Sequence, residues 1–448
     1  MQSGTPERRL AVASAVTIII GIVVGAGIFR TPSLVAAVTG DVGWALLIWV
    51  LGGVISLIGA LCYAELASTY PHAGGDYHFL SRAYGRQVSF LYAWAKAMVI
   101  NTGSIALLAF VFGDYLTAIV NLGSNSSAIW AVLIVLVLTV VNVTGLRIAS
   151  SLQAFFTVIV FLGLLMVAAS AFWAEPVSVS SPALFASTPS LGMMGLAMVF
   201  VLLTFGGWNE SAYISAEVKG GPKTIVSVIV VSLFLITVLY VLVNLALIHG
   251  LGLSALASSQ APASDLVLKG MGLWAEWLVS ALVALAALTS INATMIVGAR
   301  SNYALGNDWR QLRFIGQWRA DRGVPVAAHI VQAMICVALI GLGSMYADGF
   351  EAMVEFTAPV FWGFLFLVGL GLMRLRRVDP DMPRPYKVPF YPVLPIIFCL
   401  MCGYLTYSSI VYAHSQGAVH ISLLVMVVGV VALMILNLFK KPRIEELP

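Results

Sequence analysis

The sequence predicts an all-α membrane protein that crosses the bilayer with twelve helices. Hydrophobic residues make up 60% of the 448-residue chain and charged residues only 9%, whereas soluble domains carry about 25% charged residues. Apolar runs of the roughly 20 residues that a membrane-spanning helix needs recur from Leu10 to Phe439. Because these runs lack the alternation of polar and apolar residues typical of barrel strands, we expect helices.

Each span is recognised by its own apolar run and by the polar or Gly/Pro-rich residues that end it. No segment between the spans is long enough for a soluble domain, so we expect one integral membrane domain over residues 1–448. In chain order the spans lie at 10–38, 43–68, 88–119, 128–145, 152–173, 192–216, 224–249, 273–299, 326–345, 350–373, 391–412 and 419–439. The longest segments between them lie at 70–87, 174–191, 250–272 and 300–325.

Basic residues fall almost wholly on one side of this topology: before the first span, after the even-numbered spans and at the end of the chain. Such an excess marks the cytoplasmic loops of membrane proteins, so we expect a multi-pass protein of the cell (inner) membrane with both termini in the cytoplasm. Because the charges are spread over many loops, we expect no nucleic-acid partner. The residues are Arg8, Arg9, Arg82, Arg86, Arg147, Lys219, Lys223, Arg310, Arg313, Arg319, Arg322, Arg374, Arg376, Arg377, Arg384, Lys387, Lys440, Lys441 and Arg443.

Two spans carry a cluster of glycine near their middle. The first span reads Gly-Ile-Val-Val-Gly-Ala-Gly-Ile-Phe over 21–29, and the sixth reads Thr-Phe-Gly-Gly-Trp-Asn-Glu over 204–210. Glycine in a helix interior costs about 1 kcal/mol relative to alanine, so such clusters allow the backbone to unwind. Close helix packing through the pair Gly21 and Gly25 is an alternative reading of the first cluster.

An inverted repeat explains both clusters together. In this interpretation spans 1–5 (about 10–173) and spans 6–10 (about 192–373) are related by the repeat, and helices 11 and 12 (about 391–439) follow it. Both broken helices would then meet near the middle of the bilayer, where transporters built from such repeats bind their substrates.

The unwound backbone predicts a site for a zwitterion. Amides at the start of the second half-helix suit a carboxylate, and carbonyls freed at both breaks suit an ammonium group. We therefore predict an α-amino acid as the ligand, with bulky side chains of the sixth span shaping the pocket for its side chain. The candidate residues are Val23, Val24, Gly25, Ala26, Gly27, Ile28, Leu203, Thr204, Phe205, Gly206, Gly207 and Trp208.

Several short motifs occur in the same order as in a known family. Residues 25–29 (Gly-Ala-Gly-Ile-Phe) resemble its GSGIF motif, 206–209 match its GGWN motif, and 384–389 match its R-P-[FY]-K-V-P loop. The segments at 71–77 and 217–222 are similar to two of its loops. The chain is thereby identified as a member of the amino acid–polyamine–organocation superfamily, close to bacterial relatives of the L-amino acid transporters. The resemblance covers nearly the whole chain and implies the leucine-transporter fold and alternating access.

The resemblance also implies a coupling residue that this chain lacks. Sodium-independent members usually carry a lysine about seven residues after a glutamine of the fifth helix, and counting from Gln153 leads to Val160. That ammonium normally occupies a sodium position of the fold. Ala286, Thr289 and Ser290 lie on one face of the eighth span, and the two hydroxyls together with carbonyls of the first break could hold Na⁺. Ordinary packing of small polar residues is the alternative.

Charged residues inside the spans are candidates for coupling or gating, because a charge at the bilayer centre costs about 2.5–3.5 kcal/mol on insertion scales. Lys96 and Glu210 are candidates for a proton carrier or for a substitute for the missing fifth-helix lysine. Alternatively, Lys96 snorkels to the interface and Glu210 opposes a cationic substrate. Arg30 either gates an outer vestibule, meets the substrate carboxylate or snorkels outward. For Glu65 and Glu217 we expect solvated surface pairs with Arg82, Arg86 or Lys219, or gate salt bridges between the same residues.

Rival functions find less support. A membrane-embedded enzyme needs a nucleophile–base pair or metal ligands at one depth, and a channel needs a continuous polar file. The runner-up is a permease for cationic amino acids or polyamines. We expect no cofactor beyond Na⁺ or H⁺ as a coupling ion, and ion coupling and obligatory exchange both stay open. The residues 120–127 lack the cysteine by which animal relatives attach an ectodomain subunit, so no such obligate partner is expected.

Overall fold

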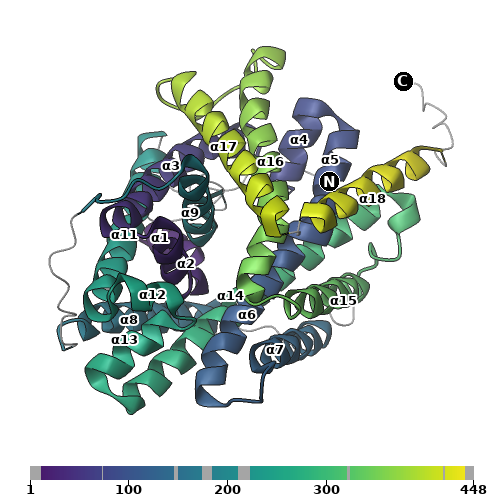
Figure 1. Cartoon of the computed structure of the whole chain (residues 1–448). Helices are drawn as coiled ribbons and strands as arrows, with labels where there is room; N and C mark the ends of the chain where they lie inside the picture. Colours follow the sequence, from purple (N-terminus) through teal and green to yellow (C-terminus); the bar gives the residue numbers. More distant parts are fainter. Residues whose placement is uncertain are drawn as a thin grey trace, which may run out of the picture.

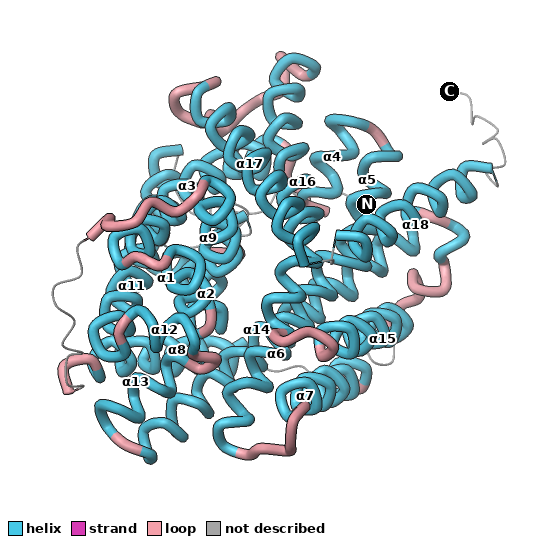
Figure 2. Tube along the Cα trace, in the orientation of Figure 1, coloured by secondary structure: helices cyan, strands magenta, loops and turns pink. Residues whose placement is uncertain are grey.

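The computed structural model of the chain is helical throughout the residues that it describes. These residues are 12–72, 74–145, 150–173, 184–209, 222–319, 323–416 and 419–438. Within them the only extended pairing is an isolated bridge between Arg319 and Val324, and Figure 2 shows helices joined by short loops. The all-α prediction therefore holds for the part of the chain described.

Each predicted span contains a helix or a set of consecutive helices among the described residues. The helices are α1 (Val12–Val23), η1 (Ala26–Phe29), α2 (Thr31–Thr39), α3 (Val42–Thr69), α4 (Asp76–Tyr84), α5 (Arg86–Ala95), η2 (Lys96–Ile100), α6 (Asn101–Ile119), α7 (Ser126–Val143), α8 (Ser150–Ser170), α9 (Leu191–Thr204), α11 (Pro222–Leu251), α12 (Leu253–Ser258), α13 (Pro262–Met271), α14 (Leu273–Asp308), η3 (Arg310–Leu312), α15 (Val326–Gly343), α16 (Gly349–Val378), α17 (Val393–Gln416) and α18 (Val419–Leu438).

Nine helices among the described residues are long and apolar enough to cross a membrane. Each of the other three predicted spans contains a shorter helix or a broken one: α1 with α2, the apolar part of α8 at Val158–Ser170, and α9. The structure thus supports a polytopic membrane protein. The count of twelve crossings and the inverted repeat stay predictions.

Side-chain caps explain where several helices begin. Asp41 Oδ1 accepts from the backbone N–H of Trp44 at the start of α3 (3.1 Å). Ser190 and Asp348 cap α9 and α16 in the same way. These short polar side chains replace the intrahelical acceptors that the first amides of a helix lack. The residue just before each of these apolar runs therefore fixes where the helix begins.

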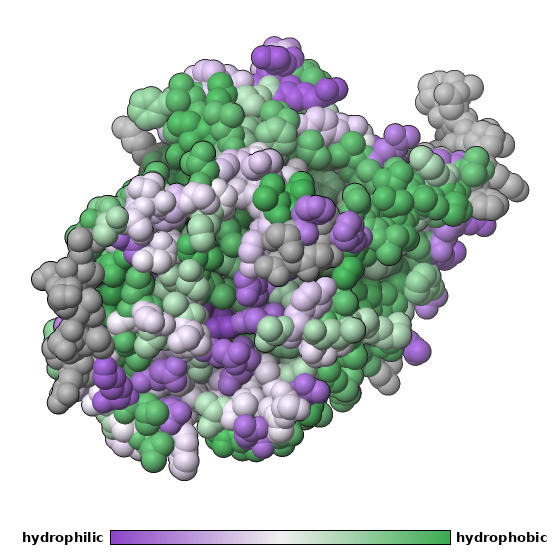
Figure 3. All heavy atoms as spheres, in the orientation of Figure 1, coloured by the Kyte–Doolittle hydropathy of each residue, from purple (hydrophilic) through white to green (hydrophobic). Residues whose placement is uncertain are grey.

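The helices are arranged so that the two broken segments lie side by side. Figure 1 shows α1, α2, α9 and α11 together on one side of the molecule and α7 with α15 at another edge, and α2 packs against α9, α1 against α11 and α7 against α15. Much of the periphery in Figure 3 is hydrophobic, and hydrophilic residues gather near the middle of the same face, where α2, α12 and α14 meet. An apolar rim around a polar centre is what a lipid-embedded protein with a polar interior requires.

Candidate functional site

The first span is interrupted where its glycines cluster. α1 ends at Val23, Gly25 is extended (φ −110°, ψ −170°), and the 3₁₀ turn η1 and then α2 continue in the same span. Gly25 offers no side-chain cap to η1, and within the described residues the amides of Gly25, Ala26 and Gly27 donate no hydrogen bond. The predicted break is therefore present, and it leaves backbone donors in the interior of the protein.

The sixth span is interrupted at its own glycine pair. α9 ends at Thr204, and a turn follows in which the Gly206 N–H donates to Leu203 O at 3.0 Å. Gly207 has a φ of +95°, a conformation that glycine adopts at no steric cost. A Cβ atom at Gly206 would lie only 2.7 Å from Leu203 O. Both glycines are thus required by the turn itself.

Three contacts join the two breaks. Thr204 Oγ1 donates to Thr31 Oγ1 at 2.6 Å, and Gly27 faces Thr204 so closely that a Cβ would meet its Oγ1 at 3.4 Å. The hydroxyl of Tyr240 reaches Val23 O at 3.1 Å and Thr204 O at 3.4 Å. The sequence interpretation missed Tyr240, because nothing local distinguishes a tyrosine of α11 that points at two breaks from one that packs in a core.

A cavity of about 360 Å³ opens beside these contacts. Most of the predicted substrate residues line it: Val23, Val24, Gly25, Ala26, Gly27, Leu203, Thr204, Gly206 and Gly207. So do four of the predicted coupling residues: Lys96, Ala286, Thr289 and Ser290. Residues from both breaks and from α14 are therefore brought to one space, although more than 170 positions separate the breaks along the chain.

Three predicted substrate residues lie outside the cavity wall. Ile28 and Phe205 are fully buried and Trp208 nearly so. The ring of Phe205 packs on Tyr240 (5.0 Å between centroids), and that of Trp208 packs on Tyr63 (5.3 Å). The sequence predicts that the bulky side chains of the sixth span shape the pocket, whereas the rings of Phe205 and Trp208 anchor the broken span to α11 and α3.

Several polar residues of the wall were not singled out from the sequence. Asn101 at the start of α6 is 9% exposed, and its Nδ2 has no hydrogen-bond partner in the described structure. Tyr92 OH donates to Asp76 Oδ2 at 2.9 Å. A polar residue in an apolar span is a usable signal for such positions. The further wall residues of this kind are Thr31, Ser104, Asn209, Thr294 and Thr357.

The predicted cation ligands lie next to the first break. Thr289 Oγ1 donates to Ala286 O at 2.8 Å, as a helix hydroxyl commonly does. A Cβ at Gly25 would be 3.6 Å from Ser290 Oγ. Val160, where relatives of the resembled family carry a lysine, is buried and also faces the cavity.

Arg30 does not snorkel outward, and that reading is wrong. Its side chain is 4% exposed, donates to Ser259 O at 2.6 Å and forms an ion pair with Asp348. Burial of a guanidinium is costly unless it is paired and hydrogen-bonded, and these partners meet that cost. Arg30 ties the second half of the broken span to the loops before α13 and α16, and it does not line the cavity.

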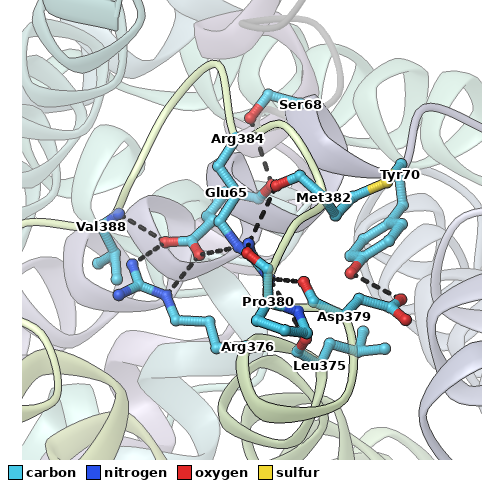
Figure 4. Close-up of polar contacts among 10 residues, drawn as sticks. All are labelled: Glu65, Ser68, Tyr70, Leu375, Arg376, Asp379, Pro380, Met382, Arg384 and Val388. Carbon is cyan, nitrogen blue, oxygen red and sulfur yellow. Dashed lines mark hydrogen bonds and ion pairs between the residues drawn. The ribbon is translucent and has the colours of Figure 1, made fainter.

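Glu65 is not a solvated surface residue, and its predicted partners are wrong. The carboxylate is 1% exposed and accepts a bidentate pair from Arg376 (Nε to Oε1 2.7 Å, Nη2 to Oε2 2.6 Å). The backbone N–H of Val388 donates to Oε2 at 2.7 Å, and Arg384 Nε lies 3.7 Å from Oε1. Figure 4 shows these groups converging between α3, the end of α16 and the loop that follows it.

Arg82, which was expected to pair with Glu65, binds Asp379 instead. Arg82 Nη2 lies 3.0 Å from Asp379 Oδ2, and Tyr70 OH donates to the same oxygen at 3.1 Å. The hydrogen bond from Arg82 is the main cause that lowers the pKa of Asp379, and the bond from Tyr70 acts in the same direction.

Lys96, a predicted coupling residue, has its Nζ 5.9 Å from the centroid of the Tyr92 ring. Glu210 and Glu217 lie outside the described residues.

Comparison with known proteins identifies the family of this chain. The family model described as amino acid permease matches residues 10–433. The b(0,+)-type amino acid transporter 1 of Mus musculus is 29% identical over 415 residues, which cover 90% of this chain and 83% of that protein. Large neutral amino acids transporter small subunit 2 and Asc-type amino acid transporter 1 of Mus musculus are 28% and 27% identical over 417 residues, which cover 90% of this chain and 76% and 77% of those proteins. The superfamily expected from the motifs is confirmed, and the chain belongs to the amino acid permease family.

Proposed function

We propose that this protein is a secondary active transporter that moves small neutral L-amino acids across the cytoplasmic membrane by alternating access. The observation that carries the proposal is the meeting of two helix breaks at one cavity. Unpaired amides at 25–27 suit a carboxylate, and the carbonyls of Val23 and Thr204 lie close enough to share the hydroxyl of Tyr240. Both groups of an α-amino acid would find main-chain partners there.

The size and the chemistry of the wall favour small neutral side chains. A volume of about 360 Å³ is at the lower end for ligand pockets. Leu203 and Phe361 contribute apolar surface, and the only cationic side chain on the wall is Lys96 within the described residues. A permease for cationic amino acids or polyamines, the runner-up, would place a substrate cation beside that ammonium at an electrostatic cost.

The described conformation fits the inward-facing half of such a cycle. The cavity extends from the breaks to Asp76 and Tyr92, beside the basic segment that we expect in the cytoplasm. On the other side Arg30 holds Asp348, and Tyr115 OH donates to Phe29 O at 2.7 Å. Alternating access then requires that the Arg30 contacts open while the path toward α4 closes.

The coupling ion is a further part of the proposal. Thr289 and Ser290 border the first break, and Na⁺ prefers such oxygen ligands. H⁺ coupling through Lys96, and obligatory exchange, are the competing schemes. Imposed sodium and pH gradients, each with and without amino acid inside the vesicles, distinguish the three.

Uptake into liposomes containing the purified protein tests the function. We expect saturable accumulation of labelled alanine, serine or threonine, with competition among them. Accumulation of cationic amino acids alone, or of no amino acid even in vesicles loaded with amino acid, would overturn the proposal. A flux that never saturates would favour a channel.

A further inference from the structure

The helix that lines the cavity opposite the broken first span is itself irregular. Between α5 and α6 the helix widens into a π turn, η2, in which the N–H of Asn101 donates to Lys96 O. Such turns are rare in proteins, and those that occur often lie at functional sites. In a regular helix, positions five apart point about 140° away from each other, whereas the wider turn brings Lys96 and Asn101 to the same cavity.

Among the described residues, neither the ammonium of Lys96 nor the side-chain Nδ2 of Asn101 has a hydrogen-bond acceptor. The ammonium of Lys96 makes no hydrogen bond or ion pair in the part of the chain described, and its contact is with the face of Tyr92. The side chain of Asn101 is nine-tenths buried with Nδ2 unpaired. A buried donor left without an acceptor is destabilising, so an incoming acceptor would be favoured here.

Four other polar side chains of the wall already use their only donor hydrogen. The hydroxyl hydrogens of Ser104, Thr289, Thr294 and Thr357 go to carbonyls of their own helices at 2.7–2.9 Å. Each hydroxyl has a single hydrogen, so these groups can only accept further bonds. The oxygens of these four hydroxyls can accept from the ammonium of a ligand, whereas Lys96 and Asn101 contribute donors to the same cavity.

From this division we propose that Lys96 and Asn101 form the subsite for the substrate side chain and select amino acids whose side chains carry a hydrogen-bond acceptor. The inference rests on the proposed function. η1, which carries the unpaired amides, packs against α6, so a ligand held by its α-carbon groups at the breaks points its side chain toward this wall. Asparagine, glutamine, serine and threonine fit the subsite, and lysine and arginine are repelled by the ammonium of Lys96.

Pairs of ligands with matched shapes test the subsite in the unaltered protein. Asparagine and leucine have similar volumes, as do glutamine and methionine, and only the amides carry acceptors. Competition against labelled alanine in liposomes should rank asparagine above leucine and glutamine above methionine, with lysine weakest. Equal competition within both pairs, or lysine as strong as methionine, would overturn the inference. Failure to bind alanine at all would instead overturn the proposed function.

Variants assign the effect to the two residues. Asn101→Leu keeps the volume and removes the donor, so the preference for asparagine over leucine should fall roughly tenfold, the size of one net hydrogen bond. Lys96→Met should raise competition by lysine, whereas Lys96→Arg, the matched control, should not. Unchanged ratios in both Asn101→Leu and Lys96→Met, with alanine binding retained, would contradict the assignment.

Discussion

Single residues at the breaks decide whether the site can form, and Gly27 is one of them because it lies against Thr204 of the other break. A Cβ there meets Thr204 Oγ1 at 3.4 Å and its Cα at 3.5 Å. The β-branched side chain of Gly27→Val would therefore push the two broken spans apart, at an overpacking cost of about 1–3 kcal/mol. We expect loss of substrate binding, measured as loss of the ligand-induced shift in melting temperature.

Gly25 supplies the matched comparison. A Cβ at this position would sit at an ordinary 3.6 Å from Ser290 Oγ, so Gly25→Ala should keep measurable binding. Wild-type binding by Gly27→Val, with normal expression, would count against the site.

At the scale of elements, the buried link between α3 and α16 should be a large local contribution to stability. Glu65→Ala would leave Arg376 and the Val388 N–H without their acceptor, and breaking a buried pair from one side costs about 3–5 kcal/mol. We expect a clear drop in melting temperature in detergent. Arg82→Ala is the control: Arg82 is 41% exposed, and a surface pair is worth about 0–1 kcal/mol. Equal shifts for both variants would contradict the assignment.

The same link shows which features of the fold the sequence could predict. Helix positions and both breaks follow from local patterns, namely apolar runs, caps and clustered glycines, and they agree with the structure. The partner of Glu65 lies 311 positions away, and no local pattern separates Arg376 from Arg82 as a candidate. The inward orientation of Phe205 and Trp208 likewise depends on how α9 packs against α3 and α11.

For the whole molecule, the buried contact between Arg30 and Asp348 should bias the balance between the two orientations. Asp348→Asn keeps an acceptor for the cap on Glu351 and removes the charge that Arg30 binds. If the conformation that is closed at Arg30 loses about 1.4 kcal/mol of stability, the equilibrium shifts tenfold toward the conformation that is open there. We expect a cysteine placed at Leu107, on the cavity wall, to react faster with a membrane-impermeant thiol reagent added outside.

Glu351→Gln is the control for that experiment. Glu351 accepts a hydrogen bond from Tyr412 and does not contact Arg30, so its labelling rate should stay near that of the parent. The native cysteines that the structure describes are all buried, which keeps the background low. Identical rates in Asp348→Asn and Glu351→Gln would exclude a gating role for the Arg30 contact.

The phenol of Tyr240 has one hydrogen to divide between two main-chain oxygens, one from each interrupted helix. The hydroxyl can therefore donate fully to only one of the two oxygens at a time. An amino group arriving there brings three hydrogens and would make up the shortfall on both sides at once. Binding of a substrate would then add hydrogen bonds to both interrupted helices at once, so that a single event would couple the two helices.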